Sequence, residues 1–288
     1  MDSKLNQQLL KFQLNEITEH EIYSRLAGVI KSPGNRKVLE KIAADELKHY
    51  RVWKKYTQRD ISPNGFKVGF YYLVSRIFGL TFGIKLMEQG EEDAQTHYRE
   101  LKGKVKEIDS FLSDENAHEK ALIGLLDEES LQYAGSVVLG LNDALVELTG
   151  ALAGLTLAFQ NTRLIALSGL ITGIAAALSM ATSEYLSTRS EDTGKNALKS
   201  ATYTGIAYII TVTILILPYL LLDNYYVCLA VSLTLAVLII AVFTYYVSVV
   251  KDQPFHARFL EMALLSLGVA ALSFVLGYFI RSALGVNI

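Results

Sequence analysis

The chain has 288 residues, of which 51% are hydrophobic, and its formal net charge is −2. Residues 1–130 hold 20 Lys and Arg with 21 Asp and Glu, whereas residues 131–288 hold 7 and 8. Since about a quarter of a typical globular chain is charged, the second part cannot be an ordinary water-soluble domain. The near-neutral total gives no nucleic-acid footprint, and a single cysteine, Cys228, excludes a disulfide framework and any cysteine-based metal site.

Residues 1–130 are predicted to form helices. Apolar residues recur every three or four positions, and no strand-like alternation is sustained. Proline occurs only at Pro33 and Pro63, and breaks fall at 32–34, at 59–65 and at Gly103. The four predicted helices are Leu5–Lys31, Asn35–Gln58, Phe66–Lys102 and Lys104–Glu129.

Each of these helices carries side chains suited to binding metal ions. The second contains DELKH and the fourth contains DENAH, so Glu46 and His49, like Glu115 and His118, stand three residues apart on one helix face. The first helix offers Glu16, and the third offers Glu88 and Glu91 in MEQGEE. Glutamates on two helices and a Glu-x-x-His pair on each of two others form the di-iron carboxylate pattern. The alternative, a solvated acidic face, explains the composition but not this alternation.

The segment Phe66–Leu86 is long and apolar and resembles a membrane span in composition. It contains Lys67, Arg76 and Lys85, and each cation is expensive in lipid. A span here would also place Glu88 and Glu91 across the membrane from the other ligands. We therefore expect an amphipathic helix at the membrane surface, a helix packed under the transmembrane part, or the beginning of the third bundle helix.

Five apolar stretches in residues 131–288 are long enough to cross a bilayer, which takes about 20 residues. Short polar connections separate them. The five predicted spans are Leu131–Phe159, Leu164–Leu186, Ala201–Leu222, Tyr225–Val250 and Phe259–Ile280. The sequence thus predicts an all-α protein in which a four-helix ferritin-like bundle, residues 1–130, precedes a five-helix transmembrane bundle, residues 131–288.

The first two spans contain side chains that are costly in lipid. Asp143 and Glu147 share one face of the first span, and Met180 and Glu184 repeat that spacing on the second. Buried carboxylates normally face a bundle interior or a water path, and a thioether beside them favours a transition metal over Ca²⁺ or Mg²⁺. The carboxylates could also carry protons for antiport. Alternatively, Glu184 is solvated at the inner interface and Asp143 is a hydrogen-bonded structural acid.

Small residues and tyrosines predict how the spans pack. The pairs Gly150/Gly154 and Gly169/Gly173 indicate close packing of the first two spans, or a dimer seam. The tyrosines of spans three to five, including Tyr208, are expected to lie partly in belts at the interfaces.

Lys and Arg near the span ends predict the orientation. With the N-terminus inside, five cations lie in inner loops and two lie outside, as the positive-inside rule requires. The first 21 residues also lack the apolar core of a signal peptide. We therefore expect a multi-pass protein of a prokaryotic plasma or inner membrane with a cytoplasmic N-terminal domain.

The first part resembles the rubrerythrin-type ferritin-like domains. Glu16 followed seven residues later by Tyr23, then DELKH, the pair Glu88/Glu91 and ENAH follow the order of that family. The CxxC rubredoxin site of typical rubrerythrins is missing. The resemblance implies a di-iron cofactor, with Mn as a second candidate, held by Glu16, Glu46, His49, Glu88, Glu91, Glu115 and His118.

The second part resembles the vacuolar iron transporter family. GLNDALVELTGALAGLTLA and SGLITGIAAALSMATSEYLSTRSE carry the resemblance, which implies that Asp143, Met180 and Glu184 line a metal path and that the protein is a homodimer. The combined layout resembles membrane-bound ferritin-like exporters of prokaryotes.

Together these features predict an exporter of Fe²⁺, with Mn²⁺ as a second candidate. Protons would drive export by exchanging with metal at Asp143, Glu147 or Glu184, and the bundle would capture, sense or deliver the ion. The alternative is a membrane-tethered ferroxidase or peroxidase with a di-iron site. An anchor, however, needs only one span and no buried carboxylates.

Overall fold

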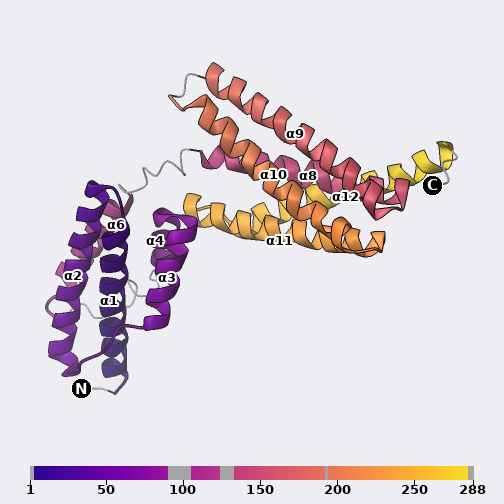
Figure 1. Ribbon diagram of the computed structural model, residues 1–288. Coiled ribbons are helices and arrows are strands. Elements are labelled where there is room, and N and C mark those ends of the chain that lie inside the picture. The colour runs from indigo at the N-terminus through magenta and orange to yellow at the C-terminus, as the bar shows by residue number, and fades with distance from the viewer. Residues whose placement is uncertain (1–2, 90–104, 124–132, 192–193, 285–288) are drawn as a thin grey trace. The chain divides into compact units, whose positions relative to one another are not determined.

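The computed structural model describes residues 3–89, 105–123, 133–191 and 194–284 (Figure 1). Their regular structure is helical, with no β-strand among them, as the sequence predicts. The chain divides into two compact units, residues 1–128 and 129–288. Each unit has its own core and is treated separately below.

The first unit is built on a pair of long helices, α1 (Ser3–Val29) and α2 (Pro33–Thr57), joined by a short turn. Ser32 caps α2 and Pro33 occupies its first turn, where the missing N–H costs nothing. Three shorter helices complete the described part: α3 (Gly65–Phe78), α4 (Leu80–Gln89) and α6 (Ile108–Ile123).

The predicted helix Phe66–Lys102 is wrong as a single element, because the chain reverses at Gly79. Gly79 has φ 96° and ψ 155°, a conformation open to glycine and costly for other residues. A Cβ on Gly83 would collide with Ser75, although residues eight apart in one straight helix are separated by about 12 Å. Helix α4 therefore folds back along α3, and α3 is an additional helix packed on α1.

Two apolar clusters form the core of this unit. One joins α1, α2, α3 and α4 through Ile22, Leu39, Ile42, Val68 and Ile84. The other joins α1, α2 and α6 through Leu9, Phe12, Trp53, Ile108 and Phe111. The stretches of α1 and α2 between these clusters face an interior that is apolar on both sides.

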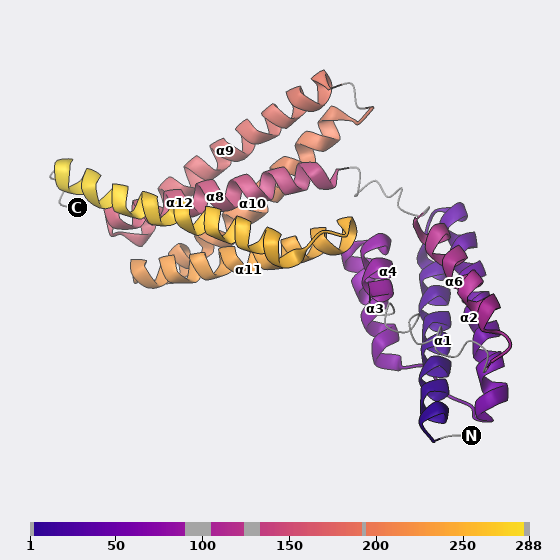
Figure 2. The same ribbon diagram turned by 180° about the vertical axis from the view of Figure 1, so that it is seen from behind.

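The described part of the second unit consists of five long helices, all of them apolar and long enough to cross a membrane (Figure 2). They confirm the five predicted spans, with ends shifted by a few residues. Their bounds are α8 (Ala134–Phe159), α9 (Thr162–Ser190), α10 (Ala197–Leu221), α11 (Tyr225–Lys251) and α12 (Phe255–Leu284). Asparagines cap α9, α10 and α11 by accepting hydrogen bonds from backbone N–H groups.

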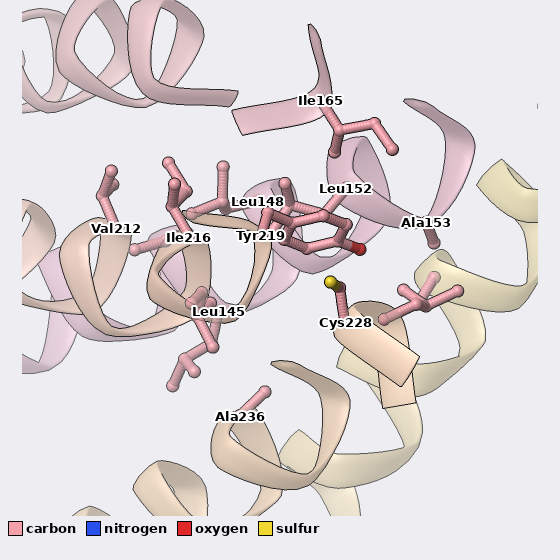
Figure 3. Packing of buried hydrophobic residues seen from close by; sticks show 14 of the residues in the cluster. Leu145, Leu148, Leu152, Ala153, Ile165, Val212, Ile216, Tyr219, Cys228 and Ala236 are labelled. Carbon is pink, nitrogen blue, oxygen red and sulfur yellow. The ribbon is translucent and has the colours of Figure 1, made fainter. Parts of the chain in front are cut away.

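The core of the second unit centres on α8 and α10, where Leu145, Leu148, Val212 and Tyr219 lie close together (Figure 3). The two glycine pairs approach different helices: a Cβ on Gly169 would come within 2.9 Å of Leu152 of α8, as close packing of the first two spans predicts, whereas the Gly150/Gly154 pair faces another helix. A Cβ on Gly154 would come within 3.1 Å of the Ser273 carbonyl oxygen of α12. Helix α12, and not the second span, therefore packs against the Gly150/Gly154 face of α8.

Candidate metal centre

Five of the seven predicted di-metal ligands converge between the two apolar clusters of the first unit. They are Glu16 from α1, Glu46 and His49 from α2, and Glu115 and His118 from α6. Glu16, Glu46 and His49 are at most 2% exposed. Ligand atoms of Glu16, Glu46, His49 and Glu115 all lie within 4.8 Å of one another, which is compact enough to surround a metal ion.

The two histidines lie on either side of the carboxylates. His49 Nδ1 is 3.5 Å from Glu46 Oε2 and 3.8 Å from Glu115 Oε1. His118 Nδ1 is 3.1 Å from Glu46 Oε1 and 3.9 Å from Glu115 Oε2. Each of the two glutamates thus directs one oxygen toward each histidine. Glu46, Glu115 and the two histidines would therefore be able to hold metal together.

The outer nitrogen of each histidine contacts an aspartate from the opposite helix. His49 Nε2 is 3.2 Å from Asp114 Oδ2, and His118 Nε2 is 3.4 Å from Asp45 Oδ2. Such contacts orient a histidine and leave Nδ1 free to bind a metal. Sequence reasoning missed both aspartates, although each directly precedes the glutamate of its motif, in DELKH and DENAH.

Aromatic side chains fix the remaining edge of the site. Trp53 Nε1 donates a hydrogen bond to Glu16 Oε1 at 3.0 Å, and the Phe111 ring centroid lies 4.2 Å from that of His49. Trp53 is fully buried. These contacts hold Glu16 and His49 in place.

The electrostatics of the cluster favour a cation. Burial raises the pKa of Glu46 well above its ordinary value, and the charge of Glu16 raises it further. Burial likewise raises the pKa of Glu115. Burial opposes a charge on His49, but the carboxylates of Glu16, Asp114 and Glu115 together outweigh burial and raise the pKa of His49 to about 9. Crowded buried carboxylates are costly without a compensating positive charge.

Several buried atoms of the cluster also lack hydrogen-bond partners. Glu46 Oε2, His49 Nδ1 and His118 Nδ1 make no well-formed hydrogen bond to any described residue. Buried polar atoms in proteins usually have a hydrogen-bond partner. A bound metal ion would supply the missing partner for these three atoms. Carboxylate oxygens and imidazole nitrogens bind divalent iron and manganese, so the residues present fit such a centre.

The remaining two predicted ligands cannot be placed with the others. Glu88 belongs to α4, but its side chain lies outside the described residues. Glu91 also lies outside the described residues. Their role as ligands stays a prediction.

The polar residues of the spans are more dispersed. Asp143 and Glu147 lie on α8, half-buried and exposed respectively, and Met180 and Glu184 lie half-buried on α9. Ser136 Oγ of α8 donates to Glu184 Oε1 at 2.6 Å, so Glu184 ties α9 to α8. Among the described residues, these carboxylates form no close group like that of the first unit.

Helix α10 supplies a polar partner that the sequence did not reveal. Tyr208 OH donates to Glu147 Oε2 at 2.8 Å, and Tyr208 is fully buried. Tyr208 thus points into the helix bundle, a role that its place among the span tyrosines does not predict. Thr204, one turn earlier, donates to the Ser136 carbonyl oxygen. A polar seam therefore runs between α8 and α10.

A comparison with known protein families finds a match in the first two spans. Residues 134–197, which cover α8, α9 and the first residue of α10, match the family model described as the VIT family. No curated protein matches the chain. The match and the membrane-spanning helices support a vacuolar iron transporter-like domain that carries metal ions.

Proposed function

We propose that this protein exports Fe²⁺ from the cytoplasm, with Mn²⁺ as a second candidate cargo, and that the N-terminal bundle captures, senses or delivers the metal. One observation carries the proposal: a buried carboxylate–histidine cluster stands on the same chain as a VIT-like pair of spans with carboxylates. A chain with one candidate metal site in the bundle and another in the spans could bind an ion at the first site and pass it to the second.

The bundle would hold its metal ions through Glu16, Glu46, His49, Glu115 and His118, with Glu88 and Glu91 as further candidates. Asp45 and Asp114 would orient the histidines through Nε2. Bound iron of this ligand type supplies redox chemistry with oxygen or peroxide. The chain's own contribution is a dry, acidic pocket of fixed geometry.

The path through the membrane would involve Asp143, Glu147, Met180 and Glu184. Carboxylates exchange protons for metal ions because both compete for the same oxygens. The sulfur of Met180 favours a transition metal. We therefore infer that the proton gradient drives export, with Asp143, Glu147 or Glu184 as the exchanging group.

The exposure of Glu147 favours a homodimer. A carboxylate is costly where it faces hydrocarbon, yet Glu147 is exposed on α8 in one copy of the chain. A second copy covering this face would remove it from lipid. The distribution of Lys and Arg supports a cytoplasmic N-terminus in a prokaryotic plasma or inner membrane.

The path assignment can be tested in proteoliposomes. Asp143→Asn keeps the shape of the side chain but removes its charge, so we expect Fe²⁺ uptake to fall to background. Asp223→Asn, an exposed aspartate between α10 and α11, is the matched control and should transport normally. Uptake by Asp143→Asn at the wild-type rate would falsify the path.

The role of the bundle can be tested in inverted vesicles, where export is measured as uptake. We expect the double variant Glu46→Ala/His49→Ala to lose bundle metal and to transport more slowly, as delivery requires. Glu40→Ala/Lys41→Ala, two exposed residues of the same helix, is the control. Faster transport by this variant would instead indicate a sensor that restrains the spans, and unchanged transport would contradict delivery by the bundle.

A membrane-tethered ferroxidase or peroxidase is the second candidate function. The closed, buried cluster favours it, since a di-iron carboxylate site can react with oxygen or peroxide. Oxygen consumption on addition of Fe²⁺, without net movement of iron across the membrane, would favour the enzyme. Transport in the absence of oxygen would favour the exporter.

A further inference from the structure

Helix α3 packs against the first unit by only one of its faces. Val68 is 1% exposed and Ser75 is buried, and Tyr71 and Tyr72 are half-buried beside them. These four positions recur at helical spacing and face α1 and α4. The opposite face remains uncovered.

That opposite face is also apolar. Phe66, Phe70, Leu73 and Ile77 follow one another at intervals of four, three and four residues and therefore form one stripe. Their exposed fractions are 82%, 46%, 57% and 64%. Apart from α3, Val29 alone among the described residues of this unit is a large, exposed apolar residue. Contiguous exposed apolar surface of this kind marks an interaction site.

The charges that accompany the stripe are positive. Lys67 and Arg76 are exposed on α3, and the helix contains no Asp or Glu. An apolar face bordered by Lys and Arg is typical of helices that lie in the interface of an anionic membrane. The same chain carries five helices long and apolar enough to cross a membrane, so this unit is joined along the chain to a part that a bilayer would hold.

We propose that the stripe Phe66, Phe70, Leu73 and Ile77 docks on the surface of the lipid bilayer and holds the first unit there. The apolar side chains enter the boundary between headgroups and acyl chains, about 5–10 Å deep in helices of this type. Lys67 and Arg76 stay among anionic headgroups. This docking goes beyond the transport proposal and does not depend on it.

The size of the stripe favours lipid over a second copy of the chain. A stable protein interface buries roughly 800 Å² per partner and usually contains a polar rim of both charges. The stripe has four side chains on three helical turns and only cations beside them. It therefore offers a smaller area and a less complete rim than such an interface needs. A bilayer requires neither a large area nor a complementary anionic side chain at fixed positions.

The docking can be measured in the full-length protein reconstituted in vesicles with anionic phospholipid. Cys228 is fully buried, so a cysteine introduced at the surface can be labelled selectively with a fluorophore. Leu73→Cys reports on the stripe, and Lys41→Cys, exposed on α2, is the matched control. We expect acyl-chain nitroxide lipids to quench the label at 73 several-fold more strongly than that at 41, and aqueous iodide to do the reverse.

A second pair of variants tests the stripe itself. With the label at Ile77→Cys, Phe70→Glu should abolish the quenching by nitroxide lipids, because a carboxylate is repelled from the interface. Phe70→Leu should retain it. Both positions are exposed, so neither change disturbs the packed face.

Three results would overturn the proposal. The first is a label at 73 as accessible to iodide as the label at 41. The second is shielding from both quenchers with coupling between labels on two copies, which indicates a dimer contact. The third is shielding from both quenchers without such coupling, which indicates that the protein's own spans cover α3.

Discussion

The two units hold their acidic residues in opposite ways. In the bundle, Glu16, Glu46 and Glu115 are crowded with two histidines between apolar clusters, and aspartates from facing helices orient both rings. In the spans, Glu147 accepts a hydroxyl hydrogen bond from Tyr208 of α10, whereas Glu184 accepts from Ser136 of α8 and from Thr188 of its own helix. On the proposed function, this contrast fits a bundle site whose fixed ligands retain metal and a path in the spans whose ligands stand apart and release the ion.

Metal removal should produce the largest difference between the units. A ligand present at a thousand times its Kd stabilises the folded state by about 4 kcal/mol, so chelation should lower the unfolding temperature of the bundle markedly. Trp53, the single tryptophan, contacts Glu16, and its fluorescence reports on this unit. The helices of the spans should keep their unfolding temperature, measured by circular dichroism at the later transition. An equal fall of the unfolding temperature in both units would contradict the difference between them.

The aspartates behind the histidines should have the next largest effect. Asp114→Asn and Asp45→Asn keep the side-chain shape but weaken the orientation of His49 and His118, so metal affinity should fall by about 10–100-fold each. Titration of the Trp53 fluorescence with Fe²⁺ under anaerobic conditions measures this. Asp109→Asn, exposed at the start of α6, is the control, and an equal loss there would contradict the assignment.

The third prediction concerns the stability of the spans, which depends on close backbone packing between α8 and α12. A Cβ on Gly277 would come within 2.4 Å of the Gly154 carbonyl oxygen, so Gly277→Ala should destabilise the α8–α12 pair by about 1–3 kcal/mol. Gly268 lies on the same helix with no described atom within 4 Å of such a Cβ. Gly268→Ala should be neutral or stabilising in thermal unfolding.

The smallest expected effect concerns Tyr208, which contacts Glu147 of the proposed path. Tyr208→Phe removes the hydroxyl that donates to Glu147, and one hydrogen bond contributes about 1 kcal/mol. Transport should change a few-fold while metal binding by the bundle stays constant. Tyr226→Phe, exposed on α11, should transport like the wild type; a change in bundle affinity would mean that the two sites are coupled.

Much of the candidate site could be predicted from spacing. Glu46 and His49 share a helix face because they are three residues apart, and the same holds for Glu115 and His118. Which atoms each histidine meets could not be predicted, because Asp114 and Asp45 reach it from another helix. The hydrogen bond of Tyr208 could not be predicted for the same reason: its partner Glu147 lies 61 residues away along the chain.

The sequence by itself determined the helical class and the five spans, since backbone hydrogen bonding and transfer into lipid depend on windows of about 20 residues. Only the tertiary structure decided that the chain reverses at Gly79, that α12 covers the Gly150/Gly154 face of α8, and that an apolar stripe on α3 is left exposed. The physical reason is that these features depend on which surfaces meet. Close packing between distant segments selects those partners, and no local pattern encodes them.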